Sequence, residues 1–383
     1  KCILEYNEEK PSKNTAVVVA DPSNGEILGM ASYPTFNLND PRKLTGMYTD
    51  EEIKDMSDEE YRNNLYSLWT NYCVSESYEP GSTFKPVTVA SALEEGVVKD
   101  GDTYVCKGFE TVADYKLKCH VFSTIGSHGS LTVEQALMNS CNPYMIHLAL
   151  EMGNSRFAYY QSLFGFGKIT GIDLPGETTG IVYGDRMTTI DAACNSFGQT
   201  INVNMMQMMA AYCSIINGGM LYQPHIVKRI ESANGEVVKE YKANLVRQTI
   251  TASTSKLLRR YLKNTVEEGT AKKAGVTGYS VAGKTGTAQK GDRKDNKWII
   301  SFIGHAPAEN PKFAIYVVID EPYGTTGTSG SSADVLTLTH NILEKLLPYM
   351  NVYKDASDEY EDTSSSPDEL TVDGIPAGTA SSN

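Results

Sequence analysis

The sequence predicts an α+β fold in which one antiparallel sheet is built from both ends of the chain and helices cover its faces. Three observations lead to this prediction: a hairpin pattern opens the chain, helical patterns fill its middle, and strand patterns return near its end. Strands that come in separate groups with helices between them are typical of the α+β class. The 383 residues suffice for a large core and for two domains at most.

The first hairpin pattern lies near the start of the chain. A short helical pattern over 1–11 precedes it, and apolar runs at 16–20 and 26–31 flank a turn at 21–25 that is rich in Asp, Pro, Asn and Gly. Such a turn between two strand-like runs predicts a β-hairpin. The following residues, 38–72, are polar and irregular and contain acidic helical pieces.

The middle of the chain is expected to form an all-helical subdomain. A helix that begins at Ser82 should end before Gly96, because glycine readily adopts the left-handed conformation of a helix C-cap. Thr132 and Gln135 have the spacing of a capping box at the start of another helix. Further helical patterns cover 143–152, 205–216 and 254–267.

Strand patterns dominate the last part of the globular region. An Asn-Gly turn at 234–235 indicates a second hairpin. The three strands expected to complete the sheet, and the helix expected to close the fold, cover 279–282, 298–304, 313–319 and 334–347.

The composition changes at about residue 351. Beyond it, Asp, Glu, Ser and Thr dominate and no aliphatic periodicity remains, so the chain cannot bury enough apolar surface to fold there. We therefore expect one domain over 1–350, followed by a linker or disordered tail over 351–383.

Charge and cysteine content exclude some classes of function. The formal net charge of −13 and the isoelectric point of about 5.0 argue against a nucleic-acid partner, because phosphate backbones are bound by basic surfaces. No run of about 18 apolar residues predicts a membrane span. The chain has seven cysteines, which is an odd number, and no two of them form a C-x-x-C pair, so they do not indicate a disulfide framework.

The first candidate motif is a serine with a lysine three residues later. Ser82 lies in the first turn of the predicted helix, and Lys85 shares its helix face. The lysine amine is therefore expected beside the serine hydroxyl, which needs a base to become a nucleophile. A lone Ser-x-x-Lys occurs by chance in many sequences.

Two further motifs follow in order along the chain. Ser140 and Asn142 lie on an expected loop between two helices, where the hydroxyl can relay a proton and the amide can hold a substrate carbonyl. The run at 284–287 reads Lys-Thr-Gly-Thr and is expected to leave a strand. Its lysine and threonines can bind a carboxylate, and its glycine lets a substrate backbone lie close to the strand. Taken separately, these runs are better explained as a helix cap and a Gly-rich turn.

The combination of the three motifs is specific. Its order and placement are those of β-lactamases and penicillin-binding proteins. Over about residues 1–350 the sequence resembles the class B, monofunctional penicillin-binding proteins, and it looks most like the branch that serves elongation or spore cortex synthesis. The runs that carry this resemblance are YEPGSTFKP at 78–86, GFG at 165–167, FGQ at 197–199, NGG at 217–219 and GKTGTAQ at 283–289.

The resemblance implies a D,D-transpeptidase that cross-links peptidoglycan stem peptides through an acyl-enzyme, and a penicillin-binding transpeptidase fold. It implies these roles: Ser82 as nucleophile, Lys85 as general base, Ser140 as proton relay with Lys85 and Lys284, Asn142 holding the donor peptide, and Thr285, Gly286 and Thr287 binding the substrate, with the backbone N–H groups of Ser82 and Thr287 as oxyanion hole. No cofactor is needed for this chemistry.

The same resemblance implies partners and a location. The donor would be a D-Ala-D-Ala stem peptide, the acceptor an amine of a neighbouring stem, and β-lactams would acylate the serine because they imitate the donor. A membrane glycosyltransferase is the expected partner. The domain would lie outside the bacterial cytoplasmic membrane, anchored by an N-terminal helix that this chain lacks, as it lacks the family's pedestal domain.

Two rival functions share the motifs. A β-lactam-hydrolysing enzyme would need a base for deacylation, and no Glu-x-x-Leu-Asn run lies between Ser140 and Lys284. A non-enzymatic β-lactam receptor would use the same serine without turnover. The lifetime of the acyl-enzyme with and without an acceptor amine distinguishes them.

A structural zinc ion is also predicted, with Cys106, Cys119, His128 and Cys141 as ligands. Their spacing is not that of a zinc finger, and buried or free thiols with a core histidine, or a Cys106–Cys119 disulfide, are the alternatives. The polar segment 101–131 offers little apolar core, and a metal stabilises such segments.

The resemblance supports this zinc prediction, because some elongation-type relatives carry Asp, His and Cys zinc ligands at the matching positions. Four such ligands with no open position suit a closed structural site. Asp114 and His120 are the nearest substitutes if one ligand is misassigned.

Overall fold

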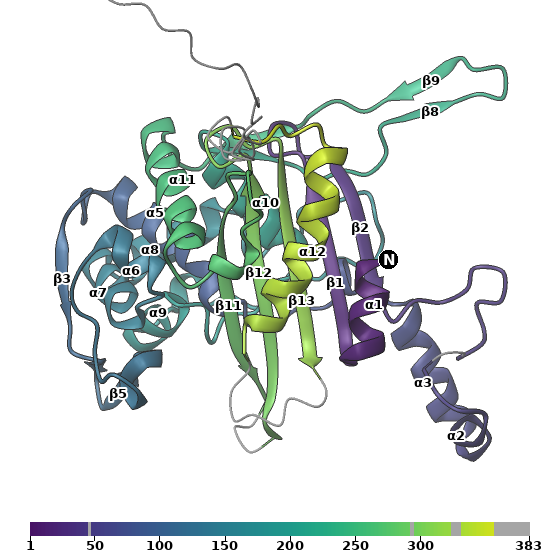
Figure 1. Ribbon diagram of the computed structural model, residues 1–383, viewed down its shortest axis with the longest axis horizontal. Coiled ribbons are helices and arrows are strands. Elements are labelled where there is room, and N and C mark those ends of the chain that lie inside the picture. Colours follow the sequence, from purple (N-terminus) through teal and green to yellow (C-terminus); the bar gives the residue numbers. More distant parts are fainter. Residues whose placement is uncertain (45–46, 292–294, 323–330, 356–383) are drawn as a thin grey trace, which may run out of the picture.

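The computed structural model describes residues 1–44, 47–291, 295–322 and 331–355 (Figure 1). Its centre is a five-stranded antiparallel sheet in the order β11-β12-β13-β1-β2. These strands are β1 (Ser12–Ala20), β2 (Ile27–Tyr33), β11 (Ala282–Lys290), β12 (Lys297–Ala306) and β13 (Phe313–Pro322). The predicted sheet from both chain ends is thereby confirmed, and β1 of the first hairpin pairs directly with β13.

Both faces of the sheet are buried. Along β1 and β13, side chains alternate between two apolar clusters, as the pleat of a strand requires. Val17 and Val19 pack under α1 (Cys2–Glu9) and α12 (Ala333–Tyr349), which lie together on one face in Figure 1. Val18, Ala16 and their neighbours pack against the larger helical part of the molecule on the other face. The sheet is therefore the middle layer of three.

The helical part contains most of the elements between β2 and β11. Its helices are α4 (Tyr72–Ser75), α5 (Lys85–Glu95), α6 (Val133–Met138), α7 (Asn142–Met152), α8 (Asn154–Leu163), α9 (Thr189–Asn195), α10 (Met205–Ile216) and α11 (Ala252–Glu267). Every residue of α10 is buried. This subdomain is not all-helical as expected, because it also carries two small two-stranded sheets, which pair β3 (Thr103–Cys106) with β6 (Gly129–Thr132) and β4 (Phe109–Val112) with β5 (Tyr115–Lys118).

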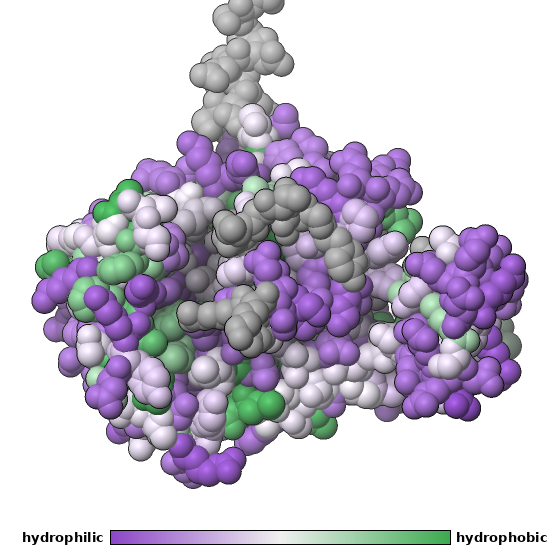
Figure 2. Space-filling model, turned by 90° about the horizontal axis from the view of Figure 1, so that it is seen from below, coloured by the Kyte–Doolittle hydropathy of each residue, from purple (hydrophilic) through white to green (hydrophobic). Residues whose placement is uncertain are grey.

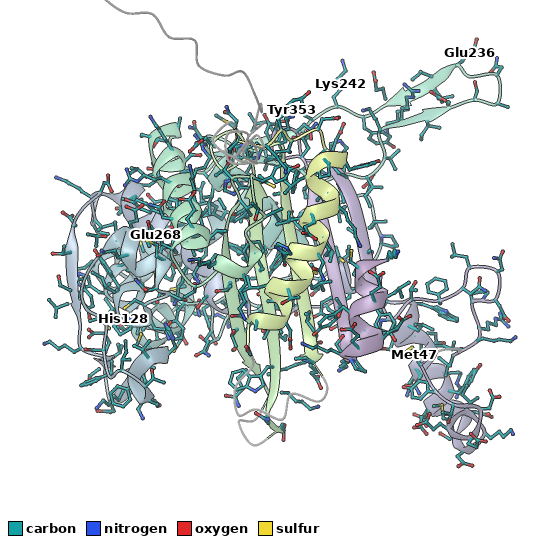
Figure 3. All side chains as sticks on the ribbon, in the orientation of Figure 1. Met47, His128, Glu236, Lys242, Glu268 and Tyr353 are labelled. Carbon is teal, nitrogen blue, oxygen red and sulfur yellow. The ribbon has the colours of Figure 1, made fainter. Side chains whose placement is uncertain are left out.

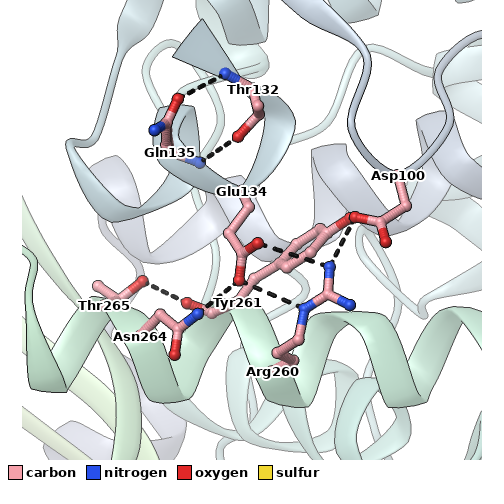
Figure 4. Close-up of polar contacts among 8 residues, drawn as sticks. All are labelled: Asp100, Thr132, Glu134, Gln135, Arg260, Tyr261, Asn264 and Thr265. Carbon is pink, nitrogen blue, oxygen red and sulfur yellow. Dashed lines mark hydrogen bonds and ion pairs between the residues drawn. The ribbon is translucent and has the colours of Figure 1, made fainter.

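Polar contacts join α6 to α11 inside this part (Figure 4). The Arg260 guanidinium donates to Asp100 at 2.6 Å and to Glu134 at 3.4 Å, and Asn264 donates to Glu134 at 2.6 Å. The Tyr261 hydroxyl and Arg260 together lower the pKa of the Asp100 carboxyl. The predicted capping box of Thr132 and Gln135 is present in the same view. These bonds hold the helix before the Ser140 loop against the long helix beside β11.

Two arms project from the body. Helices α2 (Asp50–Asp55) and α3 (Asp58–Trp69) form one, whose surface is mostly hydrophilic in the right-hand lobe of Figure 2. The other is the predicted Asn-Gly hairpin, β8 (Arg229–Glu231) with β9 (Val237–Glu240), and Glu236 marks its tip in Figure 3. A short sheet of β7 (Met220–Tyr222) and β10 (Leu245–Gln248) connects this hairpin to the body.

The strand at the edge of the sheet differs from the prediction. A strand was expected over 279–282, but β11 begins at Ala282 and runs through the Lys-Thr-Gly-Thr motif. In this motif Lys284 lies opposite Ile303 of β12, and Thr287 lies opposite Ile300. The predicted tail lies outside the described residues from position 356 onward. Among the helices of the described ranges, none is long and apolar enough to cross a membrane.

Candidate active site

Ser82 lies where the chain turns into a buried helix. The residues around it form a short 3-10 helix (Gly81–Phe84), and α5 begins at Lys85. Gly81 has a φ of +57°, and its amide donates to the Gly198 carbonyl at 2.9 Å, so this turn is attached to the 197–199 loop. The expected placement of Ser82 in the first turn of a helix is confirmed.

A line of hydrogen bonds leads from Ser82 to Lys85. The Ser140 and Ser82 hydroxyl oxygens are 3.0 Å apart, and the Lys85 ammonium donates to the Ser140 hydroxyl at 3.0 Å. Lys85 also donates to the Ser140 carbonyl at 2.6 Å and to Asn142 Oδ1 at 2.7 Å. Ser140 therefore connects Ser82 with Lys85, which is the relay position predicted for it.

The Ser140 loop holds these groups by its backbone shape. It connects α6 to α7, and Ser140 has a φ of +54°, a conformation that is costly for a residue with a side chain. This conformation presents both the carbonyl and the hydroxyl of Ser140 to one ammonium group. Strain of this kind is found where the surrounding structure needs one particular geometry.

Burial changes the acidity of both motif lysines. Lys85 is fully buried, and the loss of hydration lowers the pKa of its ammonium group to about 8. Lys284 is also fully buried, and burial, with the neighbouring charge of Lys85, lowers its pKa well below the usual value. A solvent-exposed lysine at a strand end is thus excluded at position 284. Its ammonium reaches the Thr285 carbonyl at 3.2 Å and hydroxyl at 3.3 Å.

Strand β11 forms one wall of the cleft around Ser82. Thr285 and Thr287 line the cleft, and Lys284, between Gly283 and Thr285 on the same strand, is fully buried. A Cβ atom on Gly286 would lie 2.5 Å from Ser301 Oγ and 2.9 Å from the Pro80 carbonyl oxygen. The packing of the protein itself therefore requires glycine at 286, and the close approach of a substrate backbone along this strand stays a prediction.

The turn of Ser82 packs against the same strand. A Cβ atom on Gly81 would lie 2.7 Å from the Thr287 carbonyl oxygen and 3.3 Å from its amide nitrogen. The backbones next to Ser82 and at Thr287 are therefore adjacent, as the pair of amides expected for an oxyanion hole must be.

The cleft has a volume of about 850 Å³ and includes residues that the motifs did not single out. Phe197 and Gln199 come from the FGQ run, which the sequence marked only by resemblance. Thr270 and Trp298 carried no sequence signal. Lys116, Lys118 and His120, which lie on or just after β5, also line the cleft.

The predicted zinc ligands are brought together beside the active site. The ligand atoms of Cys106, Cys119, His128 and Cys141 all lie within 4.8 Å of one another, and the three cysteines are buried. His128 Nδ1 is 3.6 Å from the Cys119 sulfur and 3.8 Å from the Cys106 sulfur. Figure 3 shows His128 on the helical side of the molecule. Cys106 ends β3, whereas Cys119, His128 and Cys141 lie outside the helices and strands, and the loop of Cys141 also carries Ser140.

The acidity of this cluster fits a metal site. The thiol of Cys141 and the ring of His128 interact with the Cys119 sulfur, which lowers the Cys119 pKa and favours a thiolate. The seven cysteines, all in the described part of the chain, are free thiols, so the structure has no Cys106–Cys119 disulfide. Of the two substitutes, Asp114 lies outside the cluster, and His120 lines the cleft with its Nε2 2.9 Å from the Asn139 carbonyl.

Comparison with known proteins identifies the same family as the motifs do. Residues 15–344 match the model of the penicillin-binding protein transpeptidase domain. The chain is 38% identical over 356 residues to the Stage V sporulation protein D of Bacillus subtilis, and 30% identical over 351 residues to the peptidoglycan D,D-transpeptidase FtsI of Escherichia coli. These alignments include 91% and 90% of this chain but 51% and 53% of the relatives, so the chain spans about half their length.

Solved structures agree. Penicillin-binding protein 3 of Mycobacterium tuberculosis, in complex with ampicillin, superposes with a TM-score of 0.77 at 27% sequence identity, over 93% of this chain and 76% of that one. A D,D-transpeptidase domain from Eggerthella lenta has a TM-score of 0.76 at 27% identity, over 92% of this chain and 82% of the other. With its three motifs assembled around Ser82 on this fold, the chain belongs to the penicillin-binding protein transpeptidase family.

Proposed function

We propose that this chain is the catalytic domain of a serine D,D-transpeptidase that cross-links peptidoglycan stem peptides through an acyl-enzyme on Ser82. The observation that carries the proposal is the continuous line Ser82–Ser140–Lys85 at the floor of a cleft whose wall presents Thr285 and Thr287. Such a line supplies a nucleophile with a base and a carboxylate with hydroxyl donors. The relative FtsI is itself named a peptidoglycan D,D-transpeptidase.

Acylation follows from the geometry. The Ser82 proton passes through the Ser140 hydroxyl to neutral Lys85 while Ser82 Oγ attacks the carbonyl carbon of the penultimate D-alanine. The adjacent amides of Ser82 and Thr287 receive the oxyanion. The peptide C–N bond then breaks, the terminal D-alanine leaves with the proton from Lys85, and an ester remains on Ser82. Thr285 and Thr287 would hold the terminal carboxylate with help from Lys284. Asn142 would hold the peptide bond of the donor.

Transfer to an amine distinguishes this function from its rivals. An acceptor amine should shorten the lifetime of the acyl-enzyme formed from a D-Ala-D-Ala thioester analogue and yield a new amide. A β-lactam hydrolase would release the acyl group to water at a similar rate with or without the amine. A receptor would keep the acyl group in both conditions.

Covalent binding of β-lactams follows from the same site. Ampicillin is bound by the relative from M. tuberculosis, and the cleft here offers the same family motifs. We expect Ser82→Ala to abolish labelling by a fluorescent penicillin while the melting temperature stays near the wild-type value, because Ser82 is the group that forms the ester. Labelling of the variant at the wild-type rate would move the nucleophile elsewhere.

A structural zinc ion is the second part of the proposal. Cys106, Cys119, His128 and Cys141 offer three sulfurs and one nitrogen, and four such ligands fill a tetrahedral site. Bound zinc would tie β3, β5 and β6 to the loop of Ser140 without taking part in the reaction. The site fits because its thiols are buried and close together, and because its neighbours bias one of them, Cys119, toward a thiolate.

Elemental analysis tests the zinc. Protein purified without added metal should contain about one equivalent of zinc, and a Cys106→Ser, Cys119→Ser double variant should contain almost none. Wild-type protein that acylates normally with less than about a tenth of an equivalent would contradict the proposal.

The setting of the whole protein is proposed on the same basis. The relatives are about twice as long as this chain, and we propose that the domain works at the outer side of the bacterial cytoplasmic membrane, next to a membrane glycosyltransferase, in elongation or spore cortex synthesis. The similarity to a stage V sporulation protein favours the spore cortex. Depleting the protein and comparing cross-linked muropeptides of growing cells and spores would decide between the two roles.

A further inference from the structure

A second groove adjoins the catalytic cleft. It has a volume of about 430 Å³ and lies where β11 continues beyond the cleft, lined by Ala288, Gln289, Lys290 and Glu79 among others. Gln199 lines both this groove and the cleft around Ser82. A molecule that reached the acyl-enzyme from this side would therefore pass Glu79.

Glu79 presents to the groove a carboxylate of which one oxygen accepts a hydrogen bond. Its Oε1 accepts the backbone N–H of Thr200 at 2.8 Å, and the described residues provide no hydrogen bond to its Oε2. The side chain is partly buried, and this burial raises the pKa of the carboxyl. Glu79 stands three residues before the nucleophile, so its position is tied to that of Ser82.

A buried polar chain holds this carboxylate in place. Gln161 donates to Asn195 at 3.1 Å, and Asn195 donates to the Thr200 hydroxyl at 2.9 Å. Gln161 and Asn195 are 1% and 0% exposed. Thr200 has a φ of +58°, a conformation in which it presents its amide to Glu79. Because buried polar groups and such backbone strain are costly, this arrangement indicates a carboxylate held for a purpose.

The lysine that lines this groove already forms ion pairs with other carboxylates. Lys290 lines the same groove, but its ammonium is 2.9 Å from Asp320 and 2.8 Å from Glu321. No ion pair between Lys290 and Glu79 is present in the described part of the molecule. Glu79 thus remains free to receive a cation from outside.

The geometry points to Glu79 as the binding group for the acceptor amine of the transfer reaction. This inference rests on the proposed transpeptidase function. The donor peptide occupies the cleft along β11, so the acceptor must enter from a neighbouring surface, and primary amines are ammonium ions near neutral pH. The groove therefore takes a cationic amine at the end of a stem peptide.

The transfer balances as follows. The bound ammonium gives one proton to the Glu79 carboxylate and becomes a neutral amine. Its nitrogen forms a bond with the acyl carbon, the bond from that carbon to Ser82 Oγ breaks, and a second amine proton returns to Ser82 through Lys85 and Ser140. Glu79 finally releases its proton to solvent.

Glu79→Gln tests this role, because glutamine keeps the oxygen that accepts from Thr200 but carries no charge. A thioester analogue of D-Ala-D-Ala serves as donor. The acceptor is a diamino acid whose carboxyl group is converted to an amide, so that its amines are its only charged groups. We expect the acceptor concentration for half-maximal transfer to rise about tenfold or more, whereas penicillin acylation changes less than about twofold. Glu76→Gln removes an equal charge from an exposed position on the same segment and should behave like wild type.

An uncharged acceptor separates binding from a general loss of structure. Transfer of the acyl group to methanol should be unchanged in Glu79→Gln, because methanol brings no cation. Equal losses with amine and methanol would show that Glu79 only supports the fold of the site, and unchanged amine transfer would also overturn the inference. If wild-type protein acylates but transfers to no amine, the transpeptidase function itself is refuted and this inference with it.

Discussion

Lys85 donates three hydrogen bonds, as many as a positively charged ammonium group has N–H donors. Its acceptors are the Ser140 carbonyl, the Ser140 hydroxyl and Asn142 Oδ1, which suits an ammonium group. When Lys85 loses a proton, two N–H donors remain for the carbonyl and the amide oxygen, and its lone pair can accept the Ser140 hydroxyl. Ser140 can then accept from Ser82, so deprotonation reverses the line of hydroxyls into the direction that acylation needs.

The pH dependence of acylation follows from this reversal. Burial lowers the pKa of Lys85 from 10.5 to about 8, so the neutral, active form increases as the pH rises through about 8. We expect the second-order rate of penicillin acylation to increase about tenfold per pH unit below that value and to level off above it. Stopped-flow labelling between about pH 6 and pH 9.5 measures this. A flat profile would remove Lys85 as the base.

Lys284 should matter for chemistry more than for stability. Its buried charge has only oxygen atoms of Thr285 as described hydrogen-bond partners, and a buried charge without a counter-ion destabilises a fold. Lys284→Met keeps the apolar stem and removes the charge. We expect the melting temperature to stay constant or rise, while acylation by carboxylate-bearing penicillins falls about a hundredfold. A lower melting temperature with normal acylation would assign Lys284 to the fold alone.

At the scale of elements, the turn that carries Ser82 depends on a contact between two loops. The Gly81 amide bonds to the Gly198 carbonyl, and a Cβ atom on Gly198 would lie only 2.0 Å from the Gly81 carbonyl oxygen. The FGQ run therefore belongs to the wall behind Ser82 as well as to the cleft. Its glycine is needed both for its φ of +81° and for this close approach.

Gly198→Ala separates these two requirements when compared with Gly96→Ala. Gly96 ends α5 with a φ of +76°, and a Cβ atom there would meet nothing within 4 Å. Both variants should lose about 1 kcal/mol of unfolding free energy from the left-handed backbone. Only Gly198→Ala should also lose acylation, by about tenfold or more, because its methyl group displaces the Ser82 turn. Equal acylation rates in the two variants would contradict this account.

Local sequence predicted the elements that local interactions stabilise. The Gly96 stop, the Thr132 capping box and the Asn-Gly hairpin all agree with the structure. Strand β11 was misplaced, because Lys284 and two glycines give it little strand propensity and its pairing with β12 forms across the intervening loop. Thr270 and Trp298 gave no signal, since only the fold brings them to Ser82.

At the scale of the whole molecule, β1 lies between β13 and β2, so the two ends of the domain are inseparable. Deleting residues 1–33 removes two of the five strands and α1, and exposes the apolar edge and faces of β13. We expect this variant to be insoluble or unable to bind penicillin.

Deleting residues 356–383 is the matched truncation at the other end. Composition alone suggests that these residues add no core, so acylation rate and melting temperature should equal those of the full chain. A clear loss of either would show that the predicted linker belongs to the domain.

The pairing of β1 with β13 also orders events during synthesis. β1 ends at Ala20, but its partner begins only at Phe313. At about 5–20 residues per second, a ribosome needs roughly 15 to 60 seconds to supply that partner. Within this interval, once the Ser140 loop has been made, the nascent chain carries Ser82 and Lys85 as well, yet until β11 (Ala282–Lys290) has followed it lacks the strand that forms the wall of the cleft. A stalled nascent chain of this kind should ignore penicillin until β11 to β13 have emerged.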